Sequence, residues 1–235
     1  MPITRSESGT NLNNWIVNLG DGNYAAPDEN SVSITDIKTI NRTKKSILKT
    51  NVLNRRIMAH NITYRKIVDS TAMTDTHVAI YKMKIPYVIN TSNVDFNGQT
   101  VEGGLFVWDG LATKLDYGLA FQWVINPFDV DYKKIRYWDG SSWLSLGVSL
   151  APDNKYHTIE FHLDIPNSEA YLTIDNITYP QNVFSETPKI GFGATVDARF
   201  QAETISIYPP ELGTIPSQKV NFKDWSWEWS NDIIV

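Results

Sequence analysis

The chain has 235 residues, of which 42% are hydrophobic and 20% are charged, and its formal net charge is −5. This composition excludes intrinsic disorder as the overall state, and the excess of acidic groups argues against a nucleic-acid partner. The sequence has no cysteine, which excludes disulfides, thiolate metal ligands and a cysteine nucleophile.

In chain order, residues 1–14 are polar and predict a loose lead-in that lacks the apolar core of a signal peptide. We therefore expect a cytoplasmic protein unless a leader was removed. Basic residues recur between Lys38 and Lys66, and we interpret them as the solvated faces of strands. Apolar runs are too short to cross a bilayer, so no membrane span is predicted.

Apolar and polar residues then alternate with period two, which is typical of β-strands. Asn-Gly, Asp-Gly and Asp-Asn turns separate these segments, and no long window has the spacing of an amphipathic helix. The predicted strands cover residues 61–66, 77–85, 104–108, 117–125, 134–138, 143–146, 157–164, 170–175, 177–179, 189–192, 200–208 and 220–229. We predict one all-β domain over residues 1–235, a two-sheet antiparallel jelly-roll β-sandwich that a strand within residues 220–235 closes.

Residues 156–164, Tyr-His-Thr-Ile-Glu-Phe-His-Leu-Asp, are followed by Ala-Tyr-Leu-Thr-Ile-Asp-Asn at 170–176. This pattern resembles the laminin-G-like part of the concanavalin A-like lectin and glucanase superfamily, in which an aromatic-His pair opens a strand and a second strand ends in a tight hairpin. Tyr156 stands where tryptophan is usual, and Asn176 where glycine is usual. The resemblance implies a jelly roll and leaves lectin, glycanase, lyase and adhesive functions open.

Catalytic motifs of that superfamily do not occur in the sequence. Its glucanases place acid and nucleophile on one strand as Glu-x-Asp-x-Glu, since residues two apart share a face. Here Glu160 and Asp164 enclose His162 instead of an acid, and the arginine-rich strand of alginate lyases is missing. Glu160 with His157 or His162 is the remaining acid–base pair, for an enzyme with an aromatic-lined cavity.

Aromatic residues in strands are the main candidates for ligand binding. Sugar rings stack on tryptophan and tyrosine, while amide, carboxylate and guanidinium groups bind their hydroxyls. The competing interpretation is that these rings fill the core between two sheets. The candidate binding residues are Trp108, Asp109, Gln122, Trp123, Asn126, Arg136, Tyr137 and Trp138, with Trp108, Trp123, Tyr137 and Trp138 as the stacking set.

Residues 126–131, Asn-Pro-Phe-Asp-Val-Asp, place Asp129 and Asp131 one residue apart in a predicted loop. Laminin-G-like domains often bind calcium through loop aspartates, and oxygen ligands suit that ion. The resemblance therefore implies calcium at Asp129 and Asp131 as the one candidate cofactor.

Trp225, Trp227 and Trp229 alternate with polar residues, so in a strand their indoles share one face. We expect them to stabilise the fold by covering the core. The alternative is a contact with a partner subunit, which leaves homo-oligomerisation open.

Three functions remain open at this point. The first choice is a non-catalytic, lectin-like domain that binds carbohydrate. The alternatives are an enzyme with an aromatic-lined cavity that acts on a glycan or a small molecule by acid–base chemistry, and an adhesion or assembly domain; the partner is thus a glycan or a small-molecule ligand. An open aromatic surface favours the lectin, a large dry cavity the enzyme, and a two-fold interface over Trp225–Trp229 the assembly domain.

Overall fold

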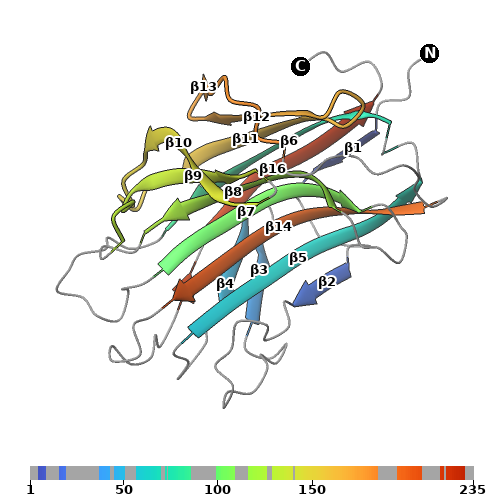
Figure 1. Ribbon diagram of the computed structural model, residues 1–235. Helices are drawn as coiled ribbons and strands as arrows, with labels where there is room; N and C mark the ends of the chain where they lie inside the picture. Colours follow the sequence, from blue (N-terminus) through green and yellow to red (C-terminus); the bar gives the residue numbers. More distant parts are fainter. Residues whose placement is uncertain are drawn as a thin grey trace.

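The computed structural model consists of β-strands and their connections (Figure 1). It describes the backbone of residues 5–8, 16–19, 37–42, 45–50, 57–69, 72, 74–85, 99–108, 116–125, 129–139, 141–184, 195–207, 218–219 and 221–230. Side chains are described for residues 72, 74–85, 118–125, 129–139, 141–184 and 223–230. Within the described ranges no helix is long and apolar enough to span a membrane.

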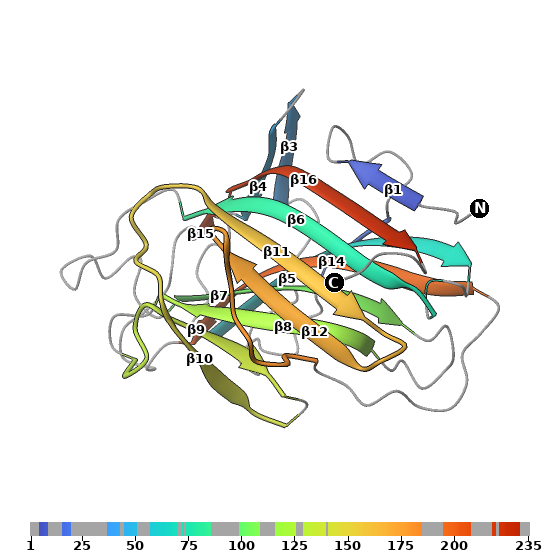
Figure 2. The same cartoon turned by 90° about the horizontal axis from the view of Figure 1, so that it is seen from above.

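Two antiparallel sheets form the two layers of the molecule, and Figure 2 looks down on the smaller of them. The six-stranded sheet has the order β1 (Arg5–Ser8), β16 (Asn221–Ser230), β6 (Thr76–Lys84), β11 (His157–Asp164), β12 (Glu169–Ile174) and β13 (Ile177–Thr178). The seven-stranded sheet has the order β10 (Trp143–Ser149), β9 (Lys134–Trp138), β8 (Asp116–Val124), β7 (Gln99–Trp108), β14 (Thr195–Ile207), β5 (Ile57–Asp69) and β2 (Ile16–Leu19).

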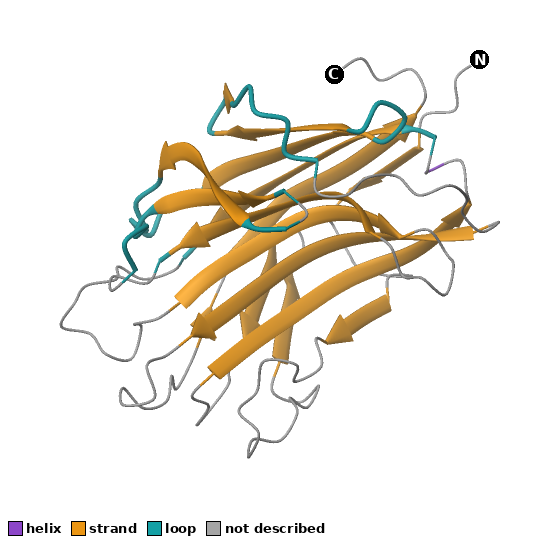
Figure 3. Cartoon of the chain, viewed as in Figure 1, coloured by secondary structure: helices purple, strands orange, loops and turns teal. Residues whose placement is uncertain are grey.

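A third, small sheet has the order β15 (Gln218–Lys219), β4 (Lys45–Thr50) and β3 (Ile37–Arg42). Figure 3 shows that strands dominate the described chain. The predicted all-β jelly-roll sandwich is confirmed, because the two large sheets are antiparallel throughout and stack face to face. The strand predicted at residues 189–192 lies outside the described residues.

Alternation along the strands sorts side chains between the core and the outer faces. In β11, Ile159, Phe161 and Leu163 are buried, while the residues between them are half-exposed. The ring of Phe161 lies 5.3 Å from that of Tyr81 in its own sheet and 5.9 Å from that of Phe121 in the facing sheet. These ring contacts join the two layers, and they bury large apolar area where it stabilises the sandwich most.

Strand β16 lies inside the six-stranded sheet, between β1 and β6. Trp225, Trp227 and Trp229 are 6%, 0% and 3% exposed, so all three indoles point into the core, as expected from their alternation. The indoles are therefore not the partner-subunit contact that the sequence left open, because they are buried within one chain.

A β-bulge resets the alternation near the start of β16. Lys223 pairs with Lys82 and Ser226 with Ile80, so β16 uses one residue more than β6 over this interval. Asp224 in the bulge has a φ of 51°. The extra residue lets Lys223 face outward while Trp225, two positions later, faces the core.

Candidate functional site

The outward face of the seven-stranded sheet carries polar and aromatic side chains of β8, β9 and β10. Gln122 pairs with Arg136 across β8 and β9, and Trp138 pairs with Trp143 across β9 and β10. Directly opposed residues of antiparallel strands share a face, as do residues two apart in one strand. These four side chains therefore lie on one face, on the side away from the core.

The two tryptophans form an aromatic pair on this face. Their ring centroids are 5.4 Å apart at an interplanar angle of 61°, and both side chains are half-buried. Asp139 closes the hairpin that carries them, because its Oδ1 accepts hydrogen bonds from the backbone N–H groups of Ser141 (2.8 Å) and Ser142 (2.7 Å). These bonds lower the pKa of Asp139, which keeps the carboxylate charged and the turn closed at neutral pH.

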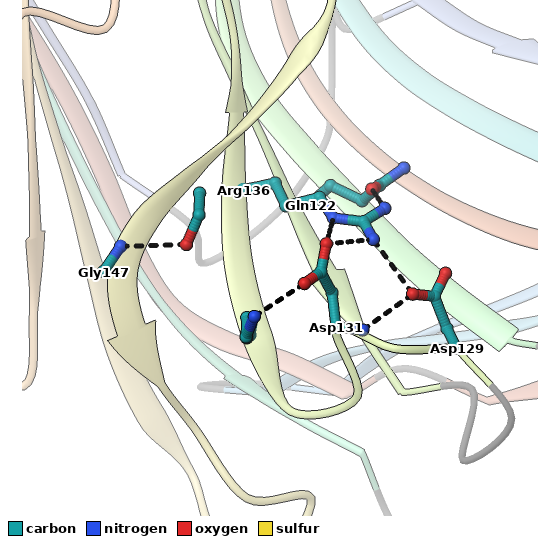
Figure 4. Close-up of polar contacts among 7 residues, drawn as sticks. Gln122, Asp129, Asp131, Arg136 and Gly147 are labelled. Carbon is teal, nitrogen blue, oxygen red and sulfur yellow. Dashed lines mark hydrogen bonds and ion pairs between the residues drawn. The ribbon is translucent and has the colours of Figure 1, made fainter.

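Arg136 is the centre of a polar network next to the tryptophan pair (Figure 4). Its Nε donates to Asp131 Oδ2 (2.8 Å), its Nη2 to Asp129 Oδ1 (3.0 Å) and its Nη1 to Gln122 Oε1 (3.1 Å). The planar guanidinium suits three acceptors in one plane. The network ties the connection between β8 and β9 to the sheet and holds the Gln122 amide in one orientation.

The carboxylates of Asp129 and Asp131 form ion pairs with basic side chains of the same chain. Besides Arg136, Lys134 Nζ donates to Asp131 Oδ1 at 2.7 Å. Hydrogen bonds from Lys134 and then Arg136 lower the pKa of Asp131. The described residues contain no group of three His, Asp or Glu side chains that could hold a metal. The geometry thus gives the predicted calcium site no support, since Arg136 and Lys134 already neutralise both aspartates.

Trp123 and Tyr137, which we predicted to stack on a sugar, lie on the core side of the sheet. Trp123 is 0% exposed, and its Nε1 donates to the Leu150 carbonyl at 2.8 Å. Tyr137 is half-buried and packs against the core. A fully buried indole offers no face to a ligand, and Tyr137 lies on the core side of its strand opposite Phe121, so we assign both residues to the core. Trp143, which sequence reasoning did not select, takes their place beside Trp138.

Three further candidate binding residues lie partly or wholly outside the described residues. Trp108 is the last residue of β7, where its register partners are Asp116 and Asp197, and its side chain lies outside the described part. Asp109 and Asn126 lie outside the described residues altogether. Their predicted binding roles stay predictions.

The proposed acid–base residues of β11 divide between its two faces. His157 faces inward, where its Nδ1 lies 2.7 Å from Asp175 Oδ2 and its ring meets the edge of Trp123. Glu160 and His162 face outward, and His162 Nε2 lies 2.6 Å from Glu160 Oε1. His157 cannot act together with Glu160, because the backbone of β11 separates them.

Glu160 and His162 are in contact, but neither ring nitrogen of His162 is available to a substrate. Nε2 of His162 is bound to Glu160, and Nδ1 is buried without a hydrogen-bond partner in the described chain. A general base needs a ring nitrogen within reach of the proton that it abstracts. The geometry therefore favours a structural contact between the two side chains.

The strand register extends the outward face toward the middle of the seven-stranded sheet. Glu102 of β7 pairs with Gln122 on one side and with Glu203 of β14 on the other. Glu203 pairs in turn with Asn61 of β5. With Arg136, these positions make a row across five neighbouring strands. No sequence motif links the two glutamates, because only strand pairing brings them together.

Comparisons with known proteins identify the fold. No protein-family model matches the chain, and no curated protein matches it. Among solved structures, basic winged bean lectin with Tn-antigen matches with a TM-score of 0.56 and 12% identity, over 98% of this chain and 100% of the lectin. A glycoside hydrolase family 16 endo-glucanase from Bacteroides ovatus matches with a TM-score of 0.51 and 14% identity, over 96% of this chain and 99% of the enzyme.

The alginate lyase Aly36B, in complex with an alginate trisaccharide, matches with a TM-score of 0.52 and 12% identity, over 94% of this chain and 97% of the lyase. These likenesses show the fold: the chain has the jelly-roll β-sandwich fold of these proteins, which the resemblance of residues 156–176 had implied. At such identities the likeness concerns the fold alone.

Proposed function

We propose that the protein binds carbohydrate on the outward face of the seven-stranded sheet. The observation that carries the proposal is the tryptophan pair Trp138–Trp143 next to the network that Arg136 holds with Gln122. A sugar ring needs an apolar surface for its C–H face and fixed polar groups for its hydroxyls. Half-buried indoles and a restrained amide meet both needs within neighbouring strands.

Proteins of similar fold support the ligand class. Three of them are in complex with the Tn-antigen, with G4G3G-2F-DNP and with an alginate trisaccharide. Their functions differ, so they favour a glycan ligand without distinguishing binding from cleavage. A non-catalytic domain is our first choice because the β11 pair has no accessible ring nitrogen for acid–base work.

A broad glycan array probed with the full chain tests the proposal, with Trp143→Ala as the diagnostic variant. We expect binding to weaken at least tenfold, because the indole pair is broken. Leu144→Ala is the matched control, since Leu144 is 40% exposed in the same hairpin and points to the other side of the sheet. An array without hits, or equal binding by both variants, would overturn the proposal.

A second candidate function is favoured by the direct pairing of Glu102 with Glu203. Like charges opposite each other in a sheet are destabilising, and glycosidases act with two carboxyl groups, so two glutamates at directly opposed positions are the candidate pair for such a reaction. In this alternative the same face cleaves the glycan that it binds.

The two candidates differ in what Glu203→Gln does. If the protein cleaves its ligand, oligosaccharide products from array-positive glycans appear with the wild type and disappear with the variant. If it only binds, neither protein releases products. Circular dichroism of both proteins verifies that the variant is folded.

A further inference from the structure

The charges on the outward face of the seven-stranded sheet bear on which glycans this face accepts. The likeness in fold leaves the charge of the ligand open, because the structures of similar fold include an endo-glucanase and an alginate lyase. Alginate consists of uronic acids, whereas a glucan carries no charge. The sign of the charge around the tryptophan pair has to decide between the two kinds of glycan.

Arg136 is the basic residue next to the tryptophan pair, two residues from Trp138 in β9. Its Nε donates to Asp131, its Nη1 to Gln122, and its Nη2 to both Asp129 and Asp131. These bonds use four of the five N–H groups of the guanidinium. A carboxylate or sulfate is typically bound by two parallel N–H groups, and Arg136 has no such pair left for a ligand.

The lysines near this network do not replace Arg136 as anion receptors. Lys134 Nζ donates to Asp131 Oδ1 at 2.7 Å, so its charge is already paired. Lys133 is exposed, but it precedes β9 and lies at the opposite end of that strand from Trp138. The two basic residues of the network and its two aspartates carry equal and opposite charge, so the network is neutral as a whole.

Asp139 adds a negative charge directly beside the tryptophan pair. It follows Trp138 in the sequence, it is exposed, and its hydrogen bonds come from Ser141 and Ser142. The backbone N–H groups and hydroxyls of these serines lower the pKa of Asp139 without cancelling its charge. The carboxylate is therefore ionised at neutral pH and repels an anionic group that approaches Trp138.

Two glutamates continue the negative charge across the face. Glu102 is the register partner of Gln122, and Glu203 of β14 is the register partner of Glu102. Counted along the sheet at ~4.8 Å per strand and ~3.3 Å per residue, Glu102 lies about 12 Å from Trp138. A glycan of several units that starts at the tryptophan pair and runs toward the middle of the sheet passes over both glutamates.

The arginines in the distant part of this face are matched by acidic residues. Arg65 and Arg199 are register partners in β5 and β14, and they share the face of Glu203, four residues from Arg199 in the same strand. Asp197 and Asp116 lie in the next outward-facing row. Two basic and two acidic positions cancel, so the glutamate row remains the uncompensated part of these strands.

We propose, resting on the proposed function, that this face selects uncharged glycans and excludes those with uronic acid, sialic acid or sulfate groups. An acidic sugar on the tryptophan pair finds no pair of N–H groups left on Arg136 and meets the carboxylate of Asp139. Repulsion at such distances depends on ionic strength, because the Debye length is ~30 Å at 0.01 M salt and ~8 Å at 0.15 M salt. The exclusion is therefore strongest in dilute buffer.

Matched glycan pairs on an array test this selectivity. Each pair consists of a neutral oligosaccharide and the same chain with one acid group: glucose against glucuronate, galactose against sulfated galactose, and desialylated against sialylated chains. We expect the acidic member of a bound pair to bind at least about tenfold more weakly at about 0.01 M salt, and the difference to shrink at about 0.5 M salt.

Removal of single charges distinguishes electrostatic exclusion from a poor fit. Asp139→Asn keeps an oxygen acceptor for the turn but removes its charge, and Glu102→Gln removes one charge from the glutamate row. We expect the double variant to narrow the gap within each pair by about threefold at low salt. Because the measurement is a ratio within one protein, an overall loss of affinity does not affect it. Glu169→Gln is the matched control, since Glu169 is exposed on β12 of the other sheet and its removal should leave the ratio unchanged.

Three outcomes would contradict the selectivity. If acidic members bind as tightly as their neutral partners at low salt, the selectivity is wrong and the proposed function stands. If the gap is the same in the double variant as in the wild type, a cause other than charge excludes the acid. If the array has no hits at all, the proposed function itself fails, and the selectivity fails with it.

Discussion

His77 shows at the scale of one residue how a titratable group becomes part of the core. The ring is 0% exposed and stacks on Trp227 and Trp229, with centroids 5.8 Å and 6.2 Å away. Its Nε2 donates to the Ala72 carbonyl at 2.7 Å, and its Nδ1 accepts from Trp227 Nε1 at 3.1 Å. Since a carbonyl only accepts and an indole N–H only donates, both bonds require the neutral ring.

Stability should therefore fall in mild acid. Burial lowers the pKa of His77 from 6.5 to about 4. Between these values the unfolded chain binds a proton that the folded chain does not. The contribution of neutral His77 to the free energy of unfolding is therefore complete above pH 6.5 and is lost as the pH falls toward 4. The loss over this interval is about 3 kcal/mol.

Urea unfolding at a series of pH values from 7 to 4 measures this slope, and His77→Gln provides the comparison. The variant should be less stable at pH 7 but should lose less stability on acidification. Carboxylates with a lowered pKa, such as Asp131, destabilise both proteins alike in acid and cancel in the difference. Identical slopes for the two proteins would contradict a role for His77.

At the scale of single strands, the sequence was most informative where alternation is strict. The Trp-Ser-Trp-Glu-Trp pattern predicted a strand with one indole face, and β16 has it. The bulge at Asp224 was not predictable, because it depends on how β16 pairs with β6, which is far away in the sequence.

The candidate site was less predictable for the same reason. Trp123 and Trp138 both fit a binding strand, but only the sheet decides that Trp123 faces the core and Trp138 faces outward. Asp129 and Asp131 fit a calcium loop by spacing alone, because spacing does not reveal that the guanidinium of Arg136 lies between them. Local pattern indicates which residues are in strands, and long-range pairing determines which of them meet.

Strand β16 should be essential for stability, with Trp227 as its most important residue. Trp227→Ala removes a fully buried indole and should cost about 3–5 kcal/mol in the free energy of unfolding. Trp227→Phe keeps an aromatic ring but removes the donor to His77, which should cost about 1 kcal/mol from that bond, besides any change in packing.

Truncation after Pro216 should leave a chain that unfolds or aggregates, since β1 and β6 lose the strand between them.

Chemical denaturation of the two Trp227 variants measures these costs, with Trp143→Ala as the control. Trp143 is only half-buried on an outer face, so its removal should destabilise the protein less than Trp227→Ala. Equal losses at the two positions would show that burial in the core does not determine the contribution of β16.

At the scale of the whole molecule, the two sheets present different surfaces in opposite directions (Figure 1). One outward face carries the tryptophan pair and the Arg136 network, and the other carries Lys223, whose Nζ lies over the Tyr156 ring. The rings of Phe121 and Phe161 meet between the sheets, so the packed core separates the two faces. A substitution on one outward face therefore acts on the other only through this core.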